Sequence, residues 1–151
     1  WFGELLRRSE DLSGLMGDIK EALIPSTQHR FDLGIGPDGV PWVPLADGSG
    51  RTPLNDTGRM RDGINGDSGV DWVEIYSDAK QARWHQEGTP PYEIRPKAGK
   101  ALAWSGGPGP RAKVNHPGLP ARVIIGLSQE DEVTIADLAF AWLELADDGA
   151  L

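Results

Sequence analysis

Two segments of the chain repeat apolar residues at the spacing of an amphipathic helix, one near each end. In the first segment five apolar residues follow the i, i+3, i+4 rule: Leu12, Leu15, Met16, Ile19 and Leu23. Such a stripe predicts a helix with one buried face, which Phe2 and Leu5 could extend upstream. Pro25 follows the stripe, and we expect the helix to end there because the residue before a proline disfavours helical backbone angles.

The second amphipathic segment begins after Ser128, which has Asp131 three residues further on. This spacing is typical of a capping box, and Glu130, Asp131 and Glu132 complement the helix dipole. An apolar stripe follows, formed by Ile135, Leu138, Ala139, Trp142 and Leu143. These features predict a C-terminal helix with one buried face.

Between the two helices, the residues favour short strands and short helices joined by turns. β-forming residues predict strands at Val70–Tyr76, Tyr92–Ile94, Lys100–Trp104 and Ala121–Ile125. Turns are expected at Gly36–Gly39, Pro96–Gly99 and Asn115–Gly118. Residues 54–64 suggest a short helix or turn, and Ala79–Gln86 a short helix that Gly88 stops. The expected fold class is α+β, a small and mostly antiparallel sheet with an N-terminal and a C-terminal helix.

Length and loop composition indicate one domain that carries long loops. The 151 residues suit a single domain over 1–151. Its 20 Gly and 12 Pro cluster at 34–50, 88–99 and 105–120, which predicts an extended, Gly/Pro-rich loop region at about 88–120. Loops of such length are usually functional or become ordered on a partner. The sequence begins with Trp1 rather than Met, so it leaves open whether residues precede it.

Charge is distributed unevenly along an acidic chain. The net charge is −8, from 23 acidic and 15 basic residues, which argues against a general nucleic-acid binder. Residues 83–122 nevertheless hold seven basic residues against Glu87 and Glu93, whereas residues 123–151 hold seven acidic residues and no Lys or Arg. The two parts could be solvated faces that happen to segregate. Alternatively, the basic part of one copy contacts the acidic part of another, as a head-to-tail ring requires.

No motif in the sequence indicates catalysis or metal binding. There is no Cys, no HExxH and no G-x-S-x-G, and the glycine-rich runs do not continue as phosphate-binding loops. No catalytic, cofactor-binding or metal-binding residue is therefore predicted. One enzymatic alternative stays open, a loop-built site in which Arg83, His85 and His116 converge.

Six Trp residues are a high count for this length. We expect Trp42, Trp72 and Trp142 in the core, while Trp84 and Trp104 border the basic segment and could contact a neighbouring subunit, because Trp and Arg are favoured at interface hot spots. The alternatives are that these two are also core residues, or that they form a single-strand nucleic-acid surface with the arginines and lysines around them. The acidic total disfavours the nucleic-acid surface.

Several short motifs then occur in a specific order. They are Leu15-Met16, Phe31, Pro37–Leu45, Leu54, Thr57-Gly58-Arg59-Met60, Ala82–Gly88, Ile94–Leu102, Asn115–Gly118, Pro120-Ala121-Arg122 and Gly126-Leu127-Ser128. In this order they resemble the phage virion morphogenesis family, the tail-completion proteins of Mu-like and related tailed phages. The resemblance covers nearly the whole chain.

The resemblance implies a structural virion protein without catalytic activity or cofactor, made in the bacterial host cytoplasm. Such a protein would lie at the head-proximal end of the tail or in the head–tail neck, and would form a ring with itself, expected to be a hexamer. Its other expected partners are adjacent neck or connector proteins and the tail terminator or tail tube. DNA would pass through the channel without specific binding, and no membrane is involved. The alternative within the same class is a tail terminator ring protein.

The family has no agreed active site to transfer, so the site prediction is limited to a subunit interface. The candidates are the aromatic and basic residues of the middle segment and two acidic residues at the start of the C-terminal helix. They are Arg83, Trp84, Arg95, Lys97, Lys100, Trp104, Arg111, Lys113, Arg122, Glu130 and Asp131.

Overall fold

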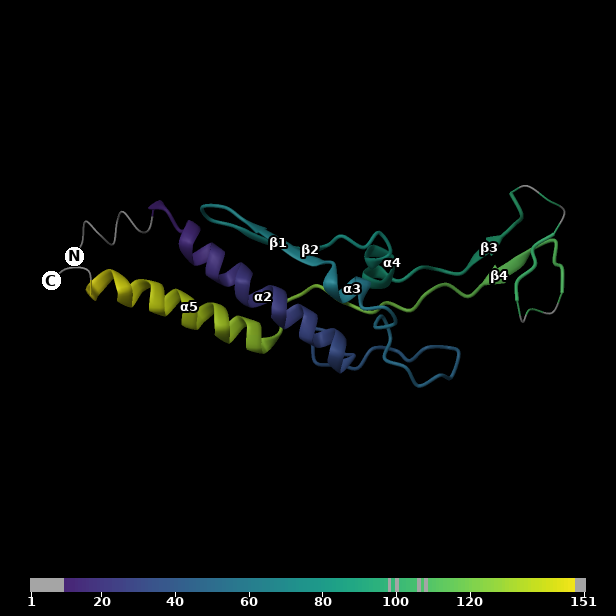
Figure 1. The fold of residues 1–151 in the computed structure, drawn as a ribbon, viewed down its shortest axis with the longest axis horizontal. Helices are drawn as coiled ribbons and strands as arrows, with labels where there is room; N and C mark the ends of the chain where they lie inside the picture. Colours follow the sequence, from purple (N-terminus) through teal and green to yellow (C-terminus); the bar gives the residue numbers. More distant parts are fainter. Residues whose placement is uncertain (1–9, 98, 100, 106, 108, 149–151) are drawn as a thin grey trace.

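The computed structural model describes residues 10–148 except 98, 100, 106 and 108, with side chains described up to residue 144. The molecule is elongated, with two long helices at one end and a thin two-stranded extension at the other (Figure 1). The elements in chain order are α2 (Ser13–Leu33), α3 (Arg59–Asp62), β1 (Ile64–Ser68), β2 (Val73–Ser77), α4 (Ala82–Glu87), β3 (Tyr92–Ile94), β4 (Val114–His116) and α5 (Gln129–Asp148). The predicted α+β class is confirmed, with two separate two-stranded antiparallel sheets.

Helix α2 continues through Pro25, so the predicted end at that residue is wrong. Proline removes one backbone hydrogen bond, but the turns that follow it bury Thr27, Arg30 and Phe31, and this packing holds the helix together. The helix ends at Gly34, which has φ of 69° and whose N–H donates to the carbonyl oxygen of Arg30 at 2.8 Å. Phe2 and Leu5 lie outside the described residues.

Helix α5 begins with the predicted capping box. The Ser128 N–H donates to Asp131 Oδ2 at 2.9 Å, and the Asp131 N–H donates to Ser128 Oγ at 3.1 Å. The helix packs on α2 through Ile135, Leu138, Ala139 and Trp142. Leu143 does not belong to this face and is 53% exposed, because one further residue turns the side chain by about 100° around the helix axis.

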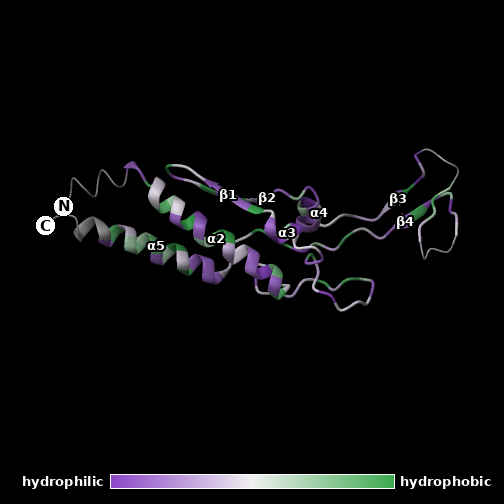
Figure 2. Ribbon diagram, viewed as in Figure 1, coloured by the Kyte–Doolittle hydropathy of each residue, from purple (hydrophilic) through white to green (hydrophobic). Residues whose placement is uncertain are grey.

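The interior consists of two small apolar clusters rather than one large core. The first lies between α2 and α5 around Leu15, Ile19 and Leu23. The second contains Phe31, Trp42, Met60, Ile64, Ala82 and Ile124. The rings of Phe31 and Trp42 meet edge to face at 5.3 Å, and Trp42 Nε1 donates to the carbonyl oxygen of Val123 at 2.9 Å. Hydropathy colouring accordingly shows hydrophobic positions recurring along both long helices (Figure 2).

Of the three tryptophans predicted in the core, two are packed in the interior and one is exposed. Trp42 is buried, and Trp142 is half-buried between α5 and α2. Trp72 is 48% exposed, because it lies in the turn between β1 and β2 rather than within the paired strand. That turn closes with the Gly69 N–H donating to the Trp72 carbonyl oxygen at 2.9 Å.

The sheet next to α2 pairs the predicted strand β2 with a strand that the sequence did not predict. β1 and β2 are antiparallel, with Ile64 opposite Ser77 and Ser68 opposite Val73. The β1 sequence, Ile-Asn-Gly-Asp-Ser, has only one β-former. Its strand conformation therefore depends on hydrogen bonding to β2 and on packing against α2 rather than on local propensity.

The predicted strand at residues 121–125 is wrong. This segment has no strand neighbour, and the side chain of Gln86 in α4 replaces one. Gln86 Oε1 accepts hydrogen bonds from the N–H groups of Ile124 and Ile125 at 2.7 and 3.0 Å, and its Nε2 donates to the Ile125 carbonyl oxygen at 2.9 Å. An extended segment can thus satisfy its backbone groups without belonging to a sheet.

Residues 88–120 form a thin extension, which we call the arm, that projects from α4 (Figure 1). Inside it β3 pairs with β4 in antiparallel register, with Tyr92 opposite His116. The two rings stack at 4.8 Å between centroids. His116 therefore lies in a strand and not in the turn predicted at 115–118. Pro117 and Gly118 follow the strand, and Gly118 has φ of 86°.

The predicted strand at residues 100–104 is also wrong. Among the described residues of this segment only Leu102 is paired, through an isolated bridge to Arg111. The glycines and prolines that follow Trp104 prevent a longer ladder. Lys100, together with Ala98 in the predicted turn at 96–99, lies outside the described residues.

Candidate subunit interface

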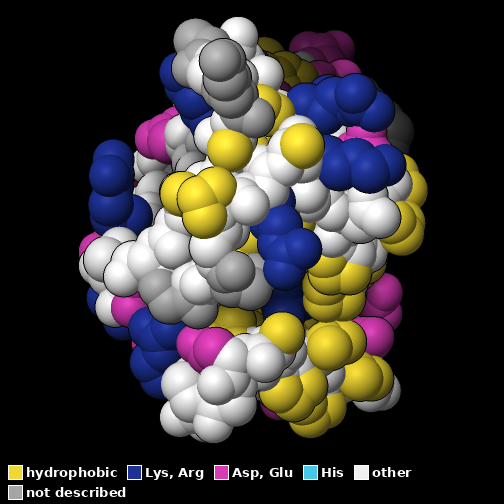
Figure 3. Space-filling view, turned by 90° about the vertical axis from the view of Figure 1, so that its right-hand side faces the viewer, with side chains coloured by type: hydrophobic (Ala, Val, Ile, Leu, Met, Phe, Trp, Pro, Cys, Tyr) yellow, Lys and Arg dark blue, Asp and Glu magenta, His cyan; other side chains and the backbone are white. Residues whose placement is uncertain are grey.

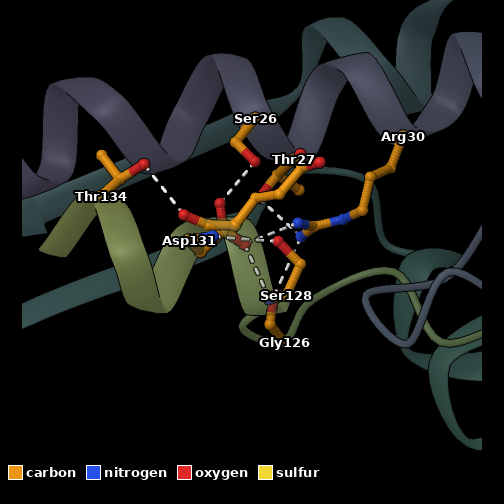
Figure 4. A network of polar contacts seen from close by, with 8 residues as sticks. Ser26, Thr27, Arg30, Gly126, Ser128, Asp131 and Thr134 are labelled. Atoms are coloured by element: carbon orange, nitrogen blue, oxygen red, sulfur yellow. Dashed lines mark hydrogen bonds and ion pairs between the residues drawn. The ribbon is translucent and has the colours of Figure 1, made fainter.

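Asp131, a predicted interface residue, is buried; it lies between α5 and α2, next to Ser26, Thr27 and Arg30 (Figure 4). Its side chain is 4% exposed and accepts hydrogen bonds from Arg30 Nη1 at 2.8 Å and from Ser26 Oγ at 2.5 Å. Arg30 also donates from Nη2 to Thr27 Oγ1 and to the Gly126 carbonyl oxygen, both at 3.0 Å. The residue therefore fastens α5 to α2 and is not available to a neighbouring subunit.

These contacts determine the protonation state of Asp131. Burial alone would raise the pKa of this carboxyl group, but the hydrogen bonds from Ser26, Ser128 and Arg30 outweigh burial and leave the pKa below its ordinary value. The carboxylate is thus charged at neutral pH and neutralises the buried guanidinium of Arg30.

Arg122, another predicted interface residue, is also buried, with 5% of its surface exposed. Its Nε donates to the Val43 carbonyl oxygen at 2.9 Å and its Nη2 to the Pro44 carbonyl oxygen at 3.2 Å. Burial lowers the pKa of Arg122. The side chain fastens the loop after Trp42 to the segment after the arm, so Arg122 and Asp131 are both removed from the candidate surface.

Apart from Arg83, the basic candidates that the structure shows to be exposed all lie in the arm. Glu93 binds Arg95 Nε and Lys113 Nζ, each at 2.6 Å. Hydrogen bonds from Lys113 and Arg95 lower the pKa of Glu93. Lys97 and Arg111 form no ion pair within the described part of the chain, and Lys100 lies outside it.

The face at the arm end combines these charges with apolar side chains. Figure 3 shows Lys and Arg side chains spread over this end, with hydrophobic side chains between them. Trp104 and Tyr92 are each 49% exposed. At the root of the arm, Trp84 is 56% exposed and Arg83 pairs with Glu87 at 3.4 Å across a turn of α4. The core alternative for Trp84 and Trp104 does not hold.

Helix α5 presents a second apolar stripe on the side that faces away from α2. We call it the outer face of α5, formed by Val133, Ala136, Phe140 and Leu143. Val133 is 56% exposed and Phe140 is 66% exposed. The exposed acidic residues Glu130, Asp137 and Glu144 run along one side of this stripe. Sequence reasoning missed this face, although the i, i+3, i+7 and i+10 spacing of its members carried the signal.

The residues of the enzymatic alternative do not converge. His85 lines a pocket beside Arg122, whereas His116 lies in β4, where its Nδ1 accepts a hydrogen bond from the Gly118 N–H at 3.0 Å. α4 and β4 lie well apart along the molecule (Figure 1). Within the described residues no group of three or more His, Asp or Glu could hold a metal ion. Among the described residues, no helix could serve as a membrane span.

Comparison with known proteins identifies the family. The sequence model of the phage virion morphogenesis family matches residues 1–144. The chain belongs to that family. No curated protein and no solved structure matches the chain. Membership in the virion morphogenesis family gives the chain a role in building the phage particle.

Proposed function

We propose that this virion morphogenesis protein is a tail-completion protein, a ring subunit in the head–tail neck that joins the tail to the head around the DNA channel. The observation that supports this function best is the pair of unlike exposed surfaces, the arm and the outer face of α5. A subunit of a cyclic ring needs two different and complementary surfaces. The other expected contacts, with neck or connector proteins and with the tail terminator or tail tube, involve the remaining surface.

The two surfaces lie at opposite ends of the long axis, since α5 occupies one end of the molecule and the arm projects from the other (Figure 1). They cannot contact each other within one copy. The arm of one copy can, however, reach the outer face of α5 on the next copy. Repetition of this head-to-tail contact closes into a ring if the rotation from one copy to the next is a whole fraction of a full turn, without a rise along the axis.

The charges of the two surfaces are opposite. The arm has five basic residues against one acidic residue, a net charge of +4, and α5 has seven acidic residues and no basic one. An antiparallel pairing of two α5 helices would bring acidic groups together, which is unfavourable. Contact between the arm and α5 instead brings Lys97 and Arg111 toward Glu130, Asp137 and Glu144, while Trp104 covers part of the exposed stripe.

The overall charge also suits a ring around a DNA channel. Affinity for the DNA backbone rises with the number of basic residues presented to the phosphates. At a net charge of −8, with arm cations directed toward neighbouring subunits, the ring would let DNA pass without holding it. We expect the isolated chain to be monomeric or weakly associated in dilute solution and to close into a six-fold ring only in the particle.

Disulfide trapping tests the contact directly, because the chain contains no Cys of its own. Trp104→Cys and Phe140→Cys are introduced into separate full-length chains, which are mixed at high concentration under mild oxidation. The proposal predicts a mixed disulfide between the two variants. Val70→Cys, which replaces an exposed residue outside both surfaces, serves as the matched control in place of Phe140→Cys and should not form that product.

Other products would contradict the proposed contact. A disulfide only between two copies of the Phe140→Cys chain would indicate an α5–α5 dimer. Equal trapping with Val70→Cys, or no mixed product at the highest soluble concentration, would indicate random or absent contact. The location in the neck is tested separately by imaging assembled particles that carry a labelled chain.

A further inference from the structure

A pocket of about 460 Å³ with both polar and apolar walls lies beneath the loop at residues 45–57, between that loop, α3 and α4. Its walls include Arg51, Asp56, Arg59, His85 and Arg122. None of these residues belongs to the arm or to the outer face of α5. The pocket therefore has no part in the proposed contact between subunits.

Arg122 is a buried cation without a carboxylate partner. Its Nε and Nη2 donate to two backbone carbonyl oxygens, and no Asp or Glu of the described chain lies within ion-pair distance. Its Nη1 makes no hydrogen bond to any described residue. A buried charge without a counter-ion is costly, and the buried Arg30 of the same molecule has Asp131 as its partner. The Nη1 group of Arg122 can therefore still donate hydrogen bonds to a molecule bound in the pocket.

Of the other arginines of the pocket, Arg59 adds to this positive charge and Arg51 does not. Arg59 is exposed and forms no ion pair with the described residues. Arg51 is neutralised by Asp56 at 2.7 Å and by Asp47 at 3.1 Å. Because Arg51 and Asp56 of the lining cancel, Arg122 and Arg59 give the lining a net charge of +2, in a chain of net charge −8.

We propose that this pocket is an oxyanion-binding site, which takes a carboxylate or a phosphate group through the guanidinium groups of Arg122 and Arg59. Guanidinium groups are planar and bind both anions through paired, charge-assisted hydrogen bonds. A bound anion supplies the counter-charge that Arg122 lacks. In a particle the anion would be an acidic side chain of an adjoining protein or a free phosphate.

His85 provides a local reporter of occupancy. Burial lowers the pKa of His85, and the charge of Arg122 lowers it further. An anion bound to Arg122 offsets that charge and raises the pKa of His85. His29 and His116 do not line the pocket and should not respond.

The experiment is an NMR titration of the three histidines in the full chain, with sodium phosphate, sodium acetate or sodium chloride added at matched ionic strength. The His85 signal is assigned from its loss in His85→Gln. We expect phosphate, acetate or both to raise the pKa of His85 saturably, while chloride has little effect. A response to acetate alone identifies a carboxylate site, and a response to phosphate alone identifies a phosphate site.

Two arginine variants test whether the response depends on the pocket. Arg59→Gln removes an exposed guanidinium with no partner in the described chain, so the fold should be retained while anion affinity falls about tenfold, as expected for loss of a charge-assisted hydrogen bond. Arg83→Gln, which changes an exposed arginine outside the pocket, is the matched control and should leave the affinity unchanged. The proposal is overturned if neither anion shifts His85 more than chloride does, or if both variants weaken binding equally.

Discussion

Arg30 Nη1 and Asp131 Oδ2 lie 2.8 Å apart, with both side chains almost completely buried. The pair joins the C-terminal turns of α2 to the first turn of α5, which are 101 residues apart in the sequence. A buried ion pair is sensitive to the loss of either partner, because the remaining charge cannot return to water. The docking of α5 on α2, and with it the position of the outer face of α5, therefore depends on this contact.

The first prediction concerns the strength of this pair. Asp131→Ala should lower the free energy of unfolding by about 3–5 kcal/mol, since it leaves Arg30 buried and unpaired and removes the capping box. Urea unfolding followed by circular dichroism measures the change. Asp137→Ala, an exposed position two turns further along α5, should change stability by less than about 0.5 kcal/mol. Equal effects of the two substitutions would contradict the role of the pair.

The second prediction concerns pH. The pKa of Asp131 is lowered in the folded state, so its contribution to stability is fully present above the unfolded pKa of about 3.9 and is lost as pH falls through the folded value. The difference in unfolding free energy between the wild type and Asp131→Asn should be constant from about pH 5 to 7 and shrink below about pH 4. Urea unfolding at each pH tests this. A difference that grows on acidification would reverse the assigned direction of the shift.

The third prediction concerns Gln86, which holds the segment at residues 124–125. Gln86→Met keeps the shape of the side chain but leaves two backbone N–H groups and one carbonyl group without partners. We expect a loss of about 1–3 kcal/mol in the free energy of unfolding and faster hydrogen exchange at the amides of Ile124 and Ile125. Gln81→Met is the matched control, because Gln81 is exposed and its side chain makes no hydrogen bond within the described chain. Unchanged amide exchange in Gln86→Met would count against the proposed role of Gln86 in holding residues 124–125.

The fourth prediction concerns the base of the arm. Gly118 has φ of 86°, and a Cβ atom there would overlap the carbonyl oxygen of Thr89 and the backbone of Pro90. Gly118→Ala should therefore separate the two sides of the arm and release the stacking of Tyr92 on His116, seen as a change in the His116 NMR signals. Gly109→Ala controls for positive φ alone, since Gly109 has φ of 97° with open space at its Cβ position. If the His116 signals respond equally to Gly118→Ala and Gly109→Ala, backbone strain at positive φ is the cause, and not the overlap of a Cβ atom with Thr89 and Pro90.

The fifth prediction concerns the charges of the proposed interface. Lys97→Glu with Arg111→Glu should leave the fold intact, because neither residue forms an ion pair within the described chain, but should block the joining of tails to heads. Infectious particles from a phage that depends on the variant chain are the readout. Replacing Glu130, Asp137 and Glu144 by Lys in the same chain should restore particles. Rescue of this kind distinguishes charge pairing from a general loss of function. Normal titres from the chain that carries only Lys97→Glu and Arg111→Glu would contradict the pairing.

The sequence predicted elements reliably where local chemistry determines them. The Ser128–Asp131 box, the turn at residues 36–39 and the stop of α4 at Gly88 all depend on neighbours within a few residues. Prediction from the sequence failed where contacts with residues distant in the sequence determine the local structure. The helix continues through Pro25 because the turns that follow it bury Thr27, Arg30 and Phe31. Residues 121–125 form no strand because Gln86 occupies the place of a neighbouring strand.

The candidate interface shows the same division. A basic middle segment and an acidic end are properties of the sequence alone, as is membership in the virion morphogenesis family. Only the tertiary structure decided which of those charges are exposed, since Arg122 and Asp131 are buried whereas Lys97, Arg111 and Asp137 face water. The composition of a segment gives the number of its charges. Their burial depends on packing against residues about a hundred positions away, and a local sequence pattern does not specify that packing.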